Sequence, residues 1–219
     1  MGSTRFPGKM IAPLGGRTLL EWVLLRASRS RLVNKVLLAT TDLERDDELV
    51  RIAESLGIEV YRGSEQDVLE RFVLAGKKYN ASLIVRICAD NPFVDPEEID
   101  RLISFYRNNE CDYACNHRAL FGSHYSDGFG AEILSFKLMV EIADRAVEKR
   151  HREHVTLFLV ENPADYVIKA VPAPSGLNKP EMRFDIDTLG DYEYIKSLLH
   201  KGVNIKTSAM EIVSLALAG

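Results

Sequence analysis

Residues 82–87 read Ser-Leu-Ile-Val-Arg-Ile, and this short apolar run is followed by Asp90 and then by Pro96. A short apolar run of this kind predicts a strand. Proline is well suited to the first turn of a helix. The apolar residues after it recur at helical spacing: Ile99, Leu102, Ile103 and Tyr106. The stretch therefore predicts a strand, a polar turn and a helix.

The chain before this stretch repeats the same alternation of helices and strands. Helices are expected at Thr18–Arg31, around residues 49–56 and at Val68–Tyr79, and short strands are expected at Lys35–Thr40 and Ile58–Tyr61. Gly57 ends the second of these helices. Three successive passes of helix and strand predict an α/β fold, with a parallel sheet covered on both faces.

The chain after this stretch is less regular. Residues Asn116–Gly130 hold three glycines, two histidines and several aromatic residues without a helical or alternating period, so we expect a long functional loop. The expected elements beyond it are a strand at Ala131–Leu134, helices at Lys137–Lys149 and about Glu153–Val160, a strand at Tyr166–Val171 and a helical region from Asp185–Asp191. No internal repeat is visible, which favours one domain over residues 1–219.

Composition and charge exclude several classes of function. With 219 residues and 46% apolar side chains, the chain can bury one substantial core. A net charge of -4 argues against a nucleic-acid partner, which needs a basic surface. No apolar run approaches the roughly 20 residues that span a membrane, and no signal peptide is visible, so we expect a cytoplasmic protein. The three cysteines and the histidines match no zinc spacing, and the cysteines are expected to be reduced core thiols.

The opening segment, residues 2–9, combines features that suit a triphosphate. Its glycines expose backbone amides, Ser3 and Thr4 supply hydroxyls, and Arg5 and Lys9 supply positive charge. The spacing is not that of a P-loop. A basic, flexible terminus is the structural alternative.

Two segments near the N-terminus, residues 3–9 (STRFPGK) and 13–19 (PLGGRTL), resemble the signature of the cytidylyltransferase family. That family includes acylneuraminate and 3-deoxy-manno-octulosonate cytidylyltransferases, and the likeness is greatest to its spore coat polysaccharide biosynthesis protein F group. The resemblance covers nearly the whole chain. It continues, in order, through residues 39–42 (ATTD), 61–69 (YRGSEQDVL), 86–93 (RICADNPF), 127–128 (DG), 152–155 (REHV) and 185–188 (DIDT).

The resemblance implies a three-layer, Rossmann-like sandwich with a mostly parallel sheet, of the nucleotide-diphospho-sugar transferase type. It also implies a homodimer that forms through an insertion at about residues 112–160. Family members usually begin with an apolar strand and an Ala-Arg pair just before the position of Met1, and this sequence has neither. Either the start codon is set too late or the chain is a degraded copy, and the intact remaining motifs favour the late start. We expect the chain to fold less stably, or to associate more, than a longer form would.

The activity implied by the resemblance is transfer of CMP from CTP to a sugar, expected to be an acidic one, with magnesium and with release of pyrophosphate. Two alternatives remain open at this point. One is a related glycosyltransferase on the same fold, because a fold alone does not determine chemistry. The other is a noncatalytic subunit that binds a sugar nucleotide, which the missing strand would favour.

The resemblance assigns the magnesium ion to Asp90 and Asp187. Asp90 follows a predicted strand, and α/β sheets bind ligands at the carboxyl ends of their strands. Magnesium accepts one or two carboxylates together with phosphate oxygens. We expect the two carboxylates to lie close together, although they are far apart in sequence. The structural alternatives are a turn at Asp90 with Pro92, and a helix cap at Asp187.

The remaining assignments concern the two substrates. Arg5 and Lys9 would bind the phosphates of CTP and assist catalysis together with Asp90, in a nucleotide site that also holds Gly2, Ser3, Thr4 and Arg62. An ion pair between Arg62 and Glu65 is an equally good explanation of that arginine.

The sugar is assigned to Asp127, Glu132 and Arg152. The two acidic groups border the irregular loop and would bind sugar hydroxyls, and Arg152 would bind a sugar carboxylate with two hydrogen bonds. For Arg152, a solvated helix start is the alternative.

Overall fold

A computed structural model describes residues 5–117 and 120–218 of the chain. Strand β5 (Leu83–Arg86) and helix α4 (Pro96–Asn108) occupy the stretch that predicted them. Asp95 caps α4, because its carboxylate accepts a hydrogen bond from the backbone amide of Glu97 at 2.8 Å. The polar turn that holds Asp90 lies between the strand and the helix.

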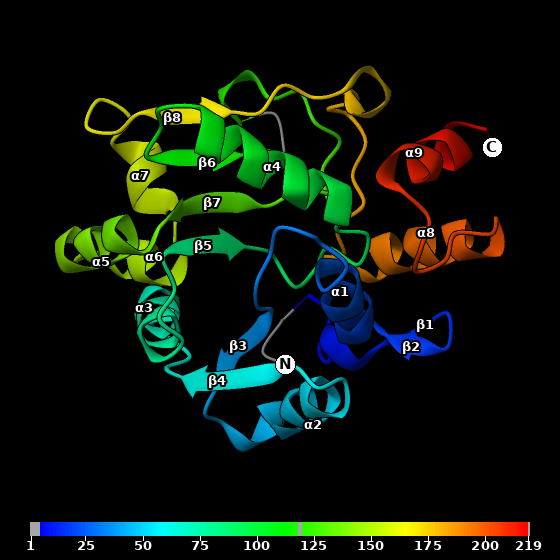
Figure 1. The fold of residues 1–219 in the computed structure, drawn as a ribbon. Helices are drawn as coiled ribbons and strands as arrows, with labels where there is room; N and C mark the ends of the chain where they lie inside the picture. The colour runs from blue at the N-terminus through cyan, green and yellow to red at the C-terminus, as the bar shows by residue number, and fades with distance from the viewer. Residues whose placement is uncertain (1–4, 118–119, 219) are drawn as a thin grey trace.

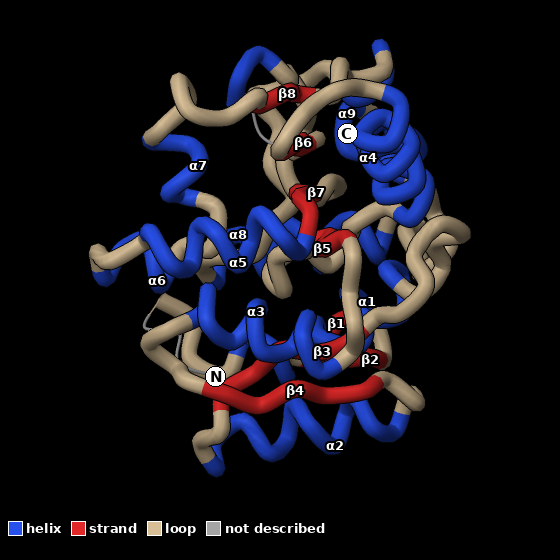
Figure 2. Tube along the Cα trace, turned by 60° about the vertical axis from the view of Figure 1, so that its left-hand side comes forward, coloured by secondary structure: helices blue, strands red, loops and turns tan. Residues whose placement is uncertain are grey.

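The first half of the chain forms the expected alternation (Figure 1). It contains α1 (Leu19–Ala27), β3 (Leu37–Thr41), α2 (Asp47–Ser55), β4 (Glu59–Gly63) and α3 (Val68–Lys78). Strands β3 and β4 pair in parallel, with Leu37 opposite Glu59. Figure 2 shows α2 and α3 on opposite sides of this pair. A small hairpin, β1 (Pro13–Leu14) and β2 (Arg17–Thr18), precedes α1.

The second half builds a mixed sheet in the order β5-β7-β6-β8. Its further strands are β6 (Tyr113–Cys115), β7 (Glu132–Ser135) and β8 (Ile168–Ala170). Strand β7 runs antiparallel to both β5 and β6, whereas β6 and β8 are parallel. The expectation of a mostly parallel sheet is corrected in this half. The reason is that β7 follows a loop and not a crossover helix, and only a parallel neighbour requires such a crossover.

The helices of the second half differ in detail from those expected. They are α5 (Phe136–Arg145), α6 (Lys149–Glu153), α7 (Leu157–Glu161), α8 (Leu189–His200) and α9 (Ala209–Leu217). Over residues 5–117 and 120–218, short 3-10 turns occur at Lys9–Ile11, Glu44–Asp46, Leu120–Gly122 and Ser175–Leu177. Strand β6 and helix α9 were not predicted. A strand of three residues is too short to show a period, so its place depends on the sheet that receives it.

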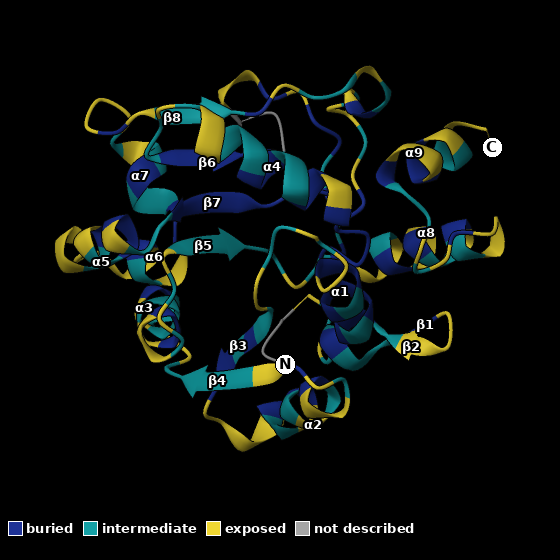
Figure 3. Ribbon diagram, in the orientation of Figure 1, coloured by how far each residue is buried: buried dark blue, intermediate teal, exposed yellow. Residues whose placement is uncertain are grey.

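Within the described residues, no backbone hydrogen bonds join the β3–β4 pair to the larger sheet. Side-chain packing holds the two parts together. One apolar core combines residues of α1, α4, α8 and α9, and a smaller one lies under β6, β7 and α5. Figure 3 shows β6 and β7 as the most deeply buried strands. Over the described part of the chain, no helix has the length and apolar character needed to cross a bilayer.

Candidate active site

The ammonium group of Lys9 lies between the carboxylates of Asp90 and Asp187. Its Nζ atom is 3.5 Å from Oδ2 of Asp90 and 3.5 Å from Oδ1 of Asp187, and it donates a hydrogen bond to the carbonyl oxygen of Ile186 at 2.8 Å. The Oδ2 atom of Asp90 and the Oδ1 atom of Asp187 are therefore separated by no more than twice the 3.5 Å that lies between each of them and Nζ. Asp90 and Asp187 are 81 and 178 positions away from Lys9 in the sequence, and the fold brings the three side chains together.

Local backbone geometry directs Lys9 to this point. Gly8 has a φ of 71°, in the left-handed region that glycine adopts without the strain a Cβ atom would cause. This bend starts the 3-10 turn at Lys9, and the amide of Lys9 donates to the carbonyl of Phe6 at 3.2 Å. The lysine side chain is only 13% exposed. It is thus held against the protein and does not extend into solvent.

The segments that carry the two carboxylates are joined by their backbones. The amide of Ile186 donates to the carbonyl of Asp90 at 2.9 Å. Asp90 follows the carboxyl end of β5, the position at which α/β sheets bind ligands. The proximity of the carboxylates therefore rests on a backbone contact as well as on the lysine between them.

Asp187 does not cap the helix that follows it. The N-cap of α8 is Thr188, which forms a reciprocal capping box with Asp191. Asp187 contributes only its backbone amide to this arrangement, at 3.1 Å from Oδ2 of Asp191. The alternative that Asp187 is a helix cap is therefore wrong, and its side chain is available to the cluster around Lys9.

Arg183 and Asp185 belong to the same cluster, and the sequence analysis missed them. Arg183 lies 2.5 Å from Asp185 and 4.0 Å from Asp187, and Arg5 lies 3.0 Å from Asp187. Hydrogen bonds from Arg183 to Asp185 raise the pKa of the arginine. Residues 183, 185 and 187 alternate along an extended segment, so their side chains share one side. That period of two was the available signal.

The loop around Asp127 lies beside the segment that carries Arg183, Asp185 and Asp187. The amide of Asp127 donates to Met182 at 3.0 Å, and the carbonyl of Asp127 accepts from Phe184 at 3.0 Å, which pairs the loop with the segment that carries Asp187. Gly128 has a φ of 102°, and a Cβ atom there would lie 2.8 Å from the backbone of Phe184. The close approach thus requires a glycine after Asp127.

Glu132 lies away from solvent, contrary to its expected role in binding sugar hydroxyls. Its side chain is 5% exposed and accepts hydrogen bonds from Arg86 at 2.5 Å, from Tyr113 at 2.9 Å and from Thr156 at 3.0 Å, with His117 at 3.2 Å. Burial disfavours the charged form, but Arg86 and His117 outweigh it and hold the pKa of Glu132 well below its usual range. Its oxygens are already used by the protein.

Arg152 is also engaged by the protein. Its guanidinium contacts Asp67 at 2.6 and 2.8 Å and donates to the carbonyl of Ala143 at 2.6 Å. Asp67 is the N-cap of α3, so this arginine fastens α6 to the start of α3. In the structure, Arg152 is therefore not free to bind a sugar carboxylate. It is not a fully solvated residue at the start of a helix either.

Arg62 pairs with Asp47 at 2.7 Å and not with Glu65, which contacts Arg45. It also donates to the carbonyls of Thr41 and Leu43, each at 2.9 Å. It therefore ties the carboxyl ends of β3 and β4 to α2. The predicted nucleotide ligands Gly2, Ser3 and Thr4 lie outside the described residues.

The cluster around Lys9 is suited to a hard cation bound together with phosphates. Two carboxylates converge on the ammonium, which shows that a positive charge is accommodated between them. Among residues 5–117 and 120–218, no group of three or more histidine, cysteine or acidic side chains could hold a metal by itself. Magnesium is commonly bound by one or two carboxylates plus substrate oxygens, so Asp90 and Asp187 fit that ion.

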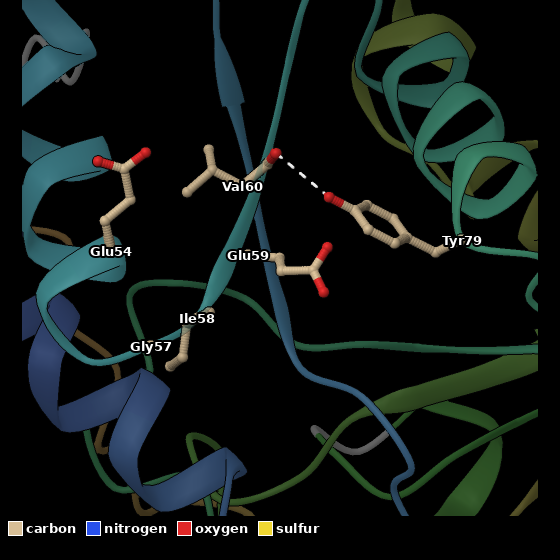
Figure 4. A pocket seen from close by; sticks show the side chains of 6 residues that line it. All are labelled: Glu54, Gly57, Ile58, Glu59, Val60 and Tyr79. Carbon is tan, nitrogen blue, oxygen red and sulfur yellow. Dashed lines mark hydrogen bonds between the residues drawn. The ribbon is translucent and has the colours of Figure 1, made fainter.

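A separate, open depression of about 360 Å³ lies at the amino end of β4 (Figure 4). It is lined by Glu54, Gly57, Ile58, Glu59, Val60 and Tyr79. The Tyr79 hydroxyl donates to the carbonyl of Val60 at 3.5 Å, and Glu59 pairs with Lys35. The depression is at the wrong end of the strands for an active site of this fold class.

Comparisons with known proteins show which family the chain resembles. A family model described as cytidylyltransferase matches residues 1–212. The spore coat polysaccharide biosynthesis protein SpsF of Bacillus subtilis (strain 168) is 38% identical over 221 residues, covering 98% of this chain and 90% of that protein. A 3-deoxy-manno-octulosonate cytidylyltransferase of Geobacter sulfurreducens is 31% identical over 104 residues, or 47% of this chain and 40% of the other.

Solved structures are similar as well. A cytidylyltransferase from Leptospira borgpetersenii superposes with a TM-score of 0.90 at 30% identity, covering 100% of this chain and 89% of that one. CMP:2-keto-3-deoxy-manno-octonic acid synthetase, solved with CTP, has a TM-score of 0.67 at 15% identity over 92% of this chain and 95% of its own. The latter similarity is one of fold alone.

Proposed function

The chain belongs to the cytidylyltransferase family, and we propose that it transfers CMP from CTP to a hydroxyl group of an acidic sugar, with release of pyrophosphate. The convergence of Lys9, Asp90 and Asp187 at the carboxyl end of β5 carries this proposal. It joins a cation that can bind phosphates to a pair of carboxylates that can share a metal ion.

The reaction is an in-line displacement at the α-phosphorus of CTP. A bond forms between that phosphorus and the sugar oxygen, the bond to the β-phosphate breaks, and the sugar hydroxyl releases a proton. Lys9 and Arg5 bind phosphate oxygens through charge-assisted hydrogen bonds and stabilise the charge that collects on pyrophosphate. Catalysis by positioning and electrostatics is typical of phosphoryl chemistry.

Asp90 and Asp187 hold the magnesium ion in this proposal. The bound ion supplies positive charge that polarises the phosphates and neutralises the leaving group. The carboxylates of these residues keep it at the carboxyl end of β5, beside the cations from the N-terminal segment. Their shared backbone contact keeps the pair aligned.

The acceptor sugar binds next to the loop that carries Asp127. That loop pairs with the segment 182–187, so its wall lies beside Asp187. Glu132 and Arg152 are largely buried against their partners, so the more exposed Arg183, although paired with Asp185, is the better placed group for a sugar carboxylate. Its side chain is 62% exposed and lies 4.0 Å from Asp187. The product would supply the synthesis of a surface polysaccharide, as the name of the Bacillus relative suggests.

We further propose that the enzyme is a cytoplasmic homodimer that pairs through residues 112–160. Within that region Val147 is 88% exposed, and an apolar side chain of this kind gains most by packing against a second subunit. Sedimentation of the purified chain, with and without Val147→Asp, tests this: the substitution should shift a dimer to a monomer.

The activity is tested by incubating the purified chain with CTP, magnesium and a panel of acidic sugars, while pyrophosphate and CMP-sugar are measured separately. We expect equal amounts of both products, and formation of both to be roughly 100-fold slower with Asp90→Asn. A glycosyltransferase would form no pyrophosphate from CTP, and would instead release a nucleotide from a sugar-nucleotide donor supplied in a parallel assay. CTP binding without any product over the whole panel would favour a noncatalytic subunit.

A further inference from the structure

The position of Lys9 raises a question about the order in which ligands bind. The same ammonium group that is assigned to the phosphates of CTP lies between the two carboxylates that are assigned to the metal ion. One group cannot serve both at once from this place. If the chain has the proposed function, the contacts of Lys9 must therefore change when the ligands bind.

The contacts of Lys9 show that it is firmly held before ligands bind. Among the described residues, its ammonium contacts the carbonyl of Ile186 at 2.8 Å and the carboxylates of Asp90 and Asp187 at 3.5 Å each. The side chain is 13% exposed, whereas that of Arg5 in the same cluster is 63% exposed. Lys9 is therefore the internal counter-ion of the carboxylate pair, and Arg5 is a peripheral one.

A divalent ion bound by both carboxylates would compete with this ammonium. Magnesium oxygen bonds are about 2.1 Å long, so an ion shared by Asp90 and Asp187 lies in the space between them. Two cations in that space repel each other strongly, because the site is partly shielded from water. Binding of the metal alone must therefore displace the Lys9 ammonium from both carboxylates.

A nucleotide triphosphate removes this obstacle. Its phosphates offer Lys9 a new set of negatively charged oxygens. They also offer the metal the oxygen ligands that two carboxylates alone do not supply. We propose that the Lys9 ammonium occupies the metal position in the free enzyme and leaves this position only when a nucleotide binds. Metal and nucleotide then bind with a positive coupling that Lys9 creates, and the free enzyme has little affinity for the metal.

The proposal is tested by titrating the full chain with Mn²⁺, whose electron paramagnetic resonance signal reports free ion, in the absence of nucleotide. We expect wild type to bind weakly and Lys9→Ala to bind at least tenfold more tightly. Lys9→Arg keeps the charge and should remain weak. Lys35→Ala, at an exposed lysine paired with Glu59, is the matched control and should behave as wild type.

A second pair of variants identifies the ligands. Adding Asp187→Asn to Lys9→Ala should abolish the gain, because the carboxylate that binds the ion is gone. Circular dichroism and a thermal melt establish that each variant is folded. Equal Mn²⁺ affinity in wild type and Lys9→Ala, both folded, would overturn the proposal, and so would a gain that persists without Asp187.

The coupling is measured by repeating the titration with a CTP analogue that carries a methylene group between the α- and β-phosphorus atoms. Wild type should bind Mn²⁺ at least tenfold more tightly with the analogue, and Lys9→Ala should show a smaller increase. If Lys9→Ala gains metal affinity but no nucleoside triphosphate affects wild type, the counter-ion role of Lys9 stands and the proposed function fails. If the analogue acts equally on both proteins, the coupling through Lys9 is wrong.

Discussion

Glu132 illustrates how strongly one buried charge depends on its neighbours. Its carboxylate is almost completely buried, and donors from β5, β6 and the segment between α6 and α7 surround it. A buried ion pair adds little net stability, but the loss of one partner leaves the other charged and uncompensated. Arg86 is the partner that would be left uncompensated here, because its guanidinium lies 2.5 Å from the Glu132 carboxylate.

Replacement Glu132→Gln should therefore lower the free energy of unfolding by about 3–5 kcal/mol at pH 7. The pKa of Glu132 is depressed in the folded state, so its ionised form stabilises the fold above the ordinary glutamate pKa of about 4.3. That stabilisation is lost as the pH falls below this value. The difference between wild type and variant should shrink accordingly in urea denaturation from pH 7 to pH 3. A constant difference would contradict the depressed pKa.

Asp90 and Asp187 should behave as one unit in catalysis. Either single change to Asn keeps the side-chain shape and the backbone bond between Ile186 and Asp90, but it removes a negative charge. We expect each to reduce kcat roughly 100-fold or more, a loss typical of the removal of one electrostatic group from an active site.

The double variant Asp90→Asn/Asp187→Asn completes the cycle. Because both carboxylates serve the same ion, the double change should cost much less in activation free energy than the sum of the singles. Steady-state kinetics with varied magnesium provide the measurement, and melting temperatures close to wild type serve as the control. Full additivity would mean that the two groups act independently.

At the scale of elements, Arg152 connects helices and not substrate. It joins α6 to the N-cap of α3 and to the carbonyl of Ala143 in α5, so three helices meet at its guanidinium. Residues of α5 and α7 pack in the smaller core together with residues of α3, β6 and β7. A side chain in this position affects how helices dock against one another.

Arg152→Ala should accordingly lower stability by about 1–3 kcal/mol, since it removes hydrogen bonds to a charged group, and leave the KM for the sugar near the wild-type value. Chemical denaturation and steady-state kinetics measure the two effects. Arg183→Ala is the comparison variant, expected to raise the KM for the sugar with little change in stability because its side chain is exposed. The reverse pattern would restore Arg152 as the sugar-binding group.

At the scale of the whole molecule, Arg26 ties distant parts of the chain together. Its side chain is 0% exposed and donates to the carbonyls of Val94, Ile205 and Thr207, and it lies 3.3 Å from Asp95. Asp95 also caps α4 and accepts the amide of Ala209, the first residue of α9. One ion pair therefore fixes α1, α4 and the C-terminal helix relative to one another.

Asp95→Asn should lower the free energy of unfolding by about 3–5 kcal/mol, because the buried guanidinium of Arg26 loses its counter-charge. Glu59→Gln, at an exposed pair with Lys35, should change stability by at most about 1 kcal/mol. Urea denaturation of both variants provides the measurement. A loss of less than 1 kcal/mol at Asp95 would show that the backbone carbonyls around Arg26 compensate for the charge by themselves.

The sequence by itself determined the elements whose signals are local. Helices α1 to α4 and strands β3 to β5 lie where apolar periods, Gly57 and Pro96 predicted them, because such signals act within one or two turns of the chain. The family followed from ordered motifs, and the prediction that Asp90 and Asp187 come together followed from that resemblance and from their expected positions at strand ends.

Tertiary structure alone decided which polar side chains remain available for ligands. Glu132 and Arg152 resemble binding residues in the sequence, but their partners Arg86 and Asp67 are 46 and 85 positions away, and only folding reveals those contacts. The same holds for β6, for the antiparallel direction of β7 and for Lys9 between two aspartates. The physical reason is that burial and charge pairing depend on distances through space, which no local pattern of residues encodes.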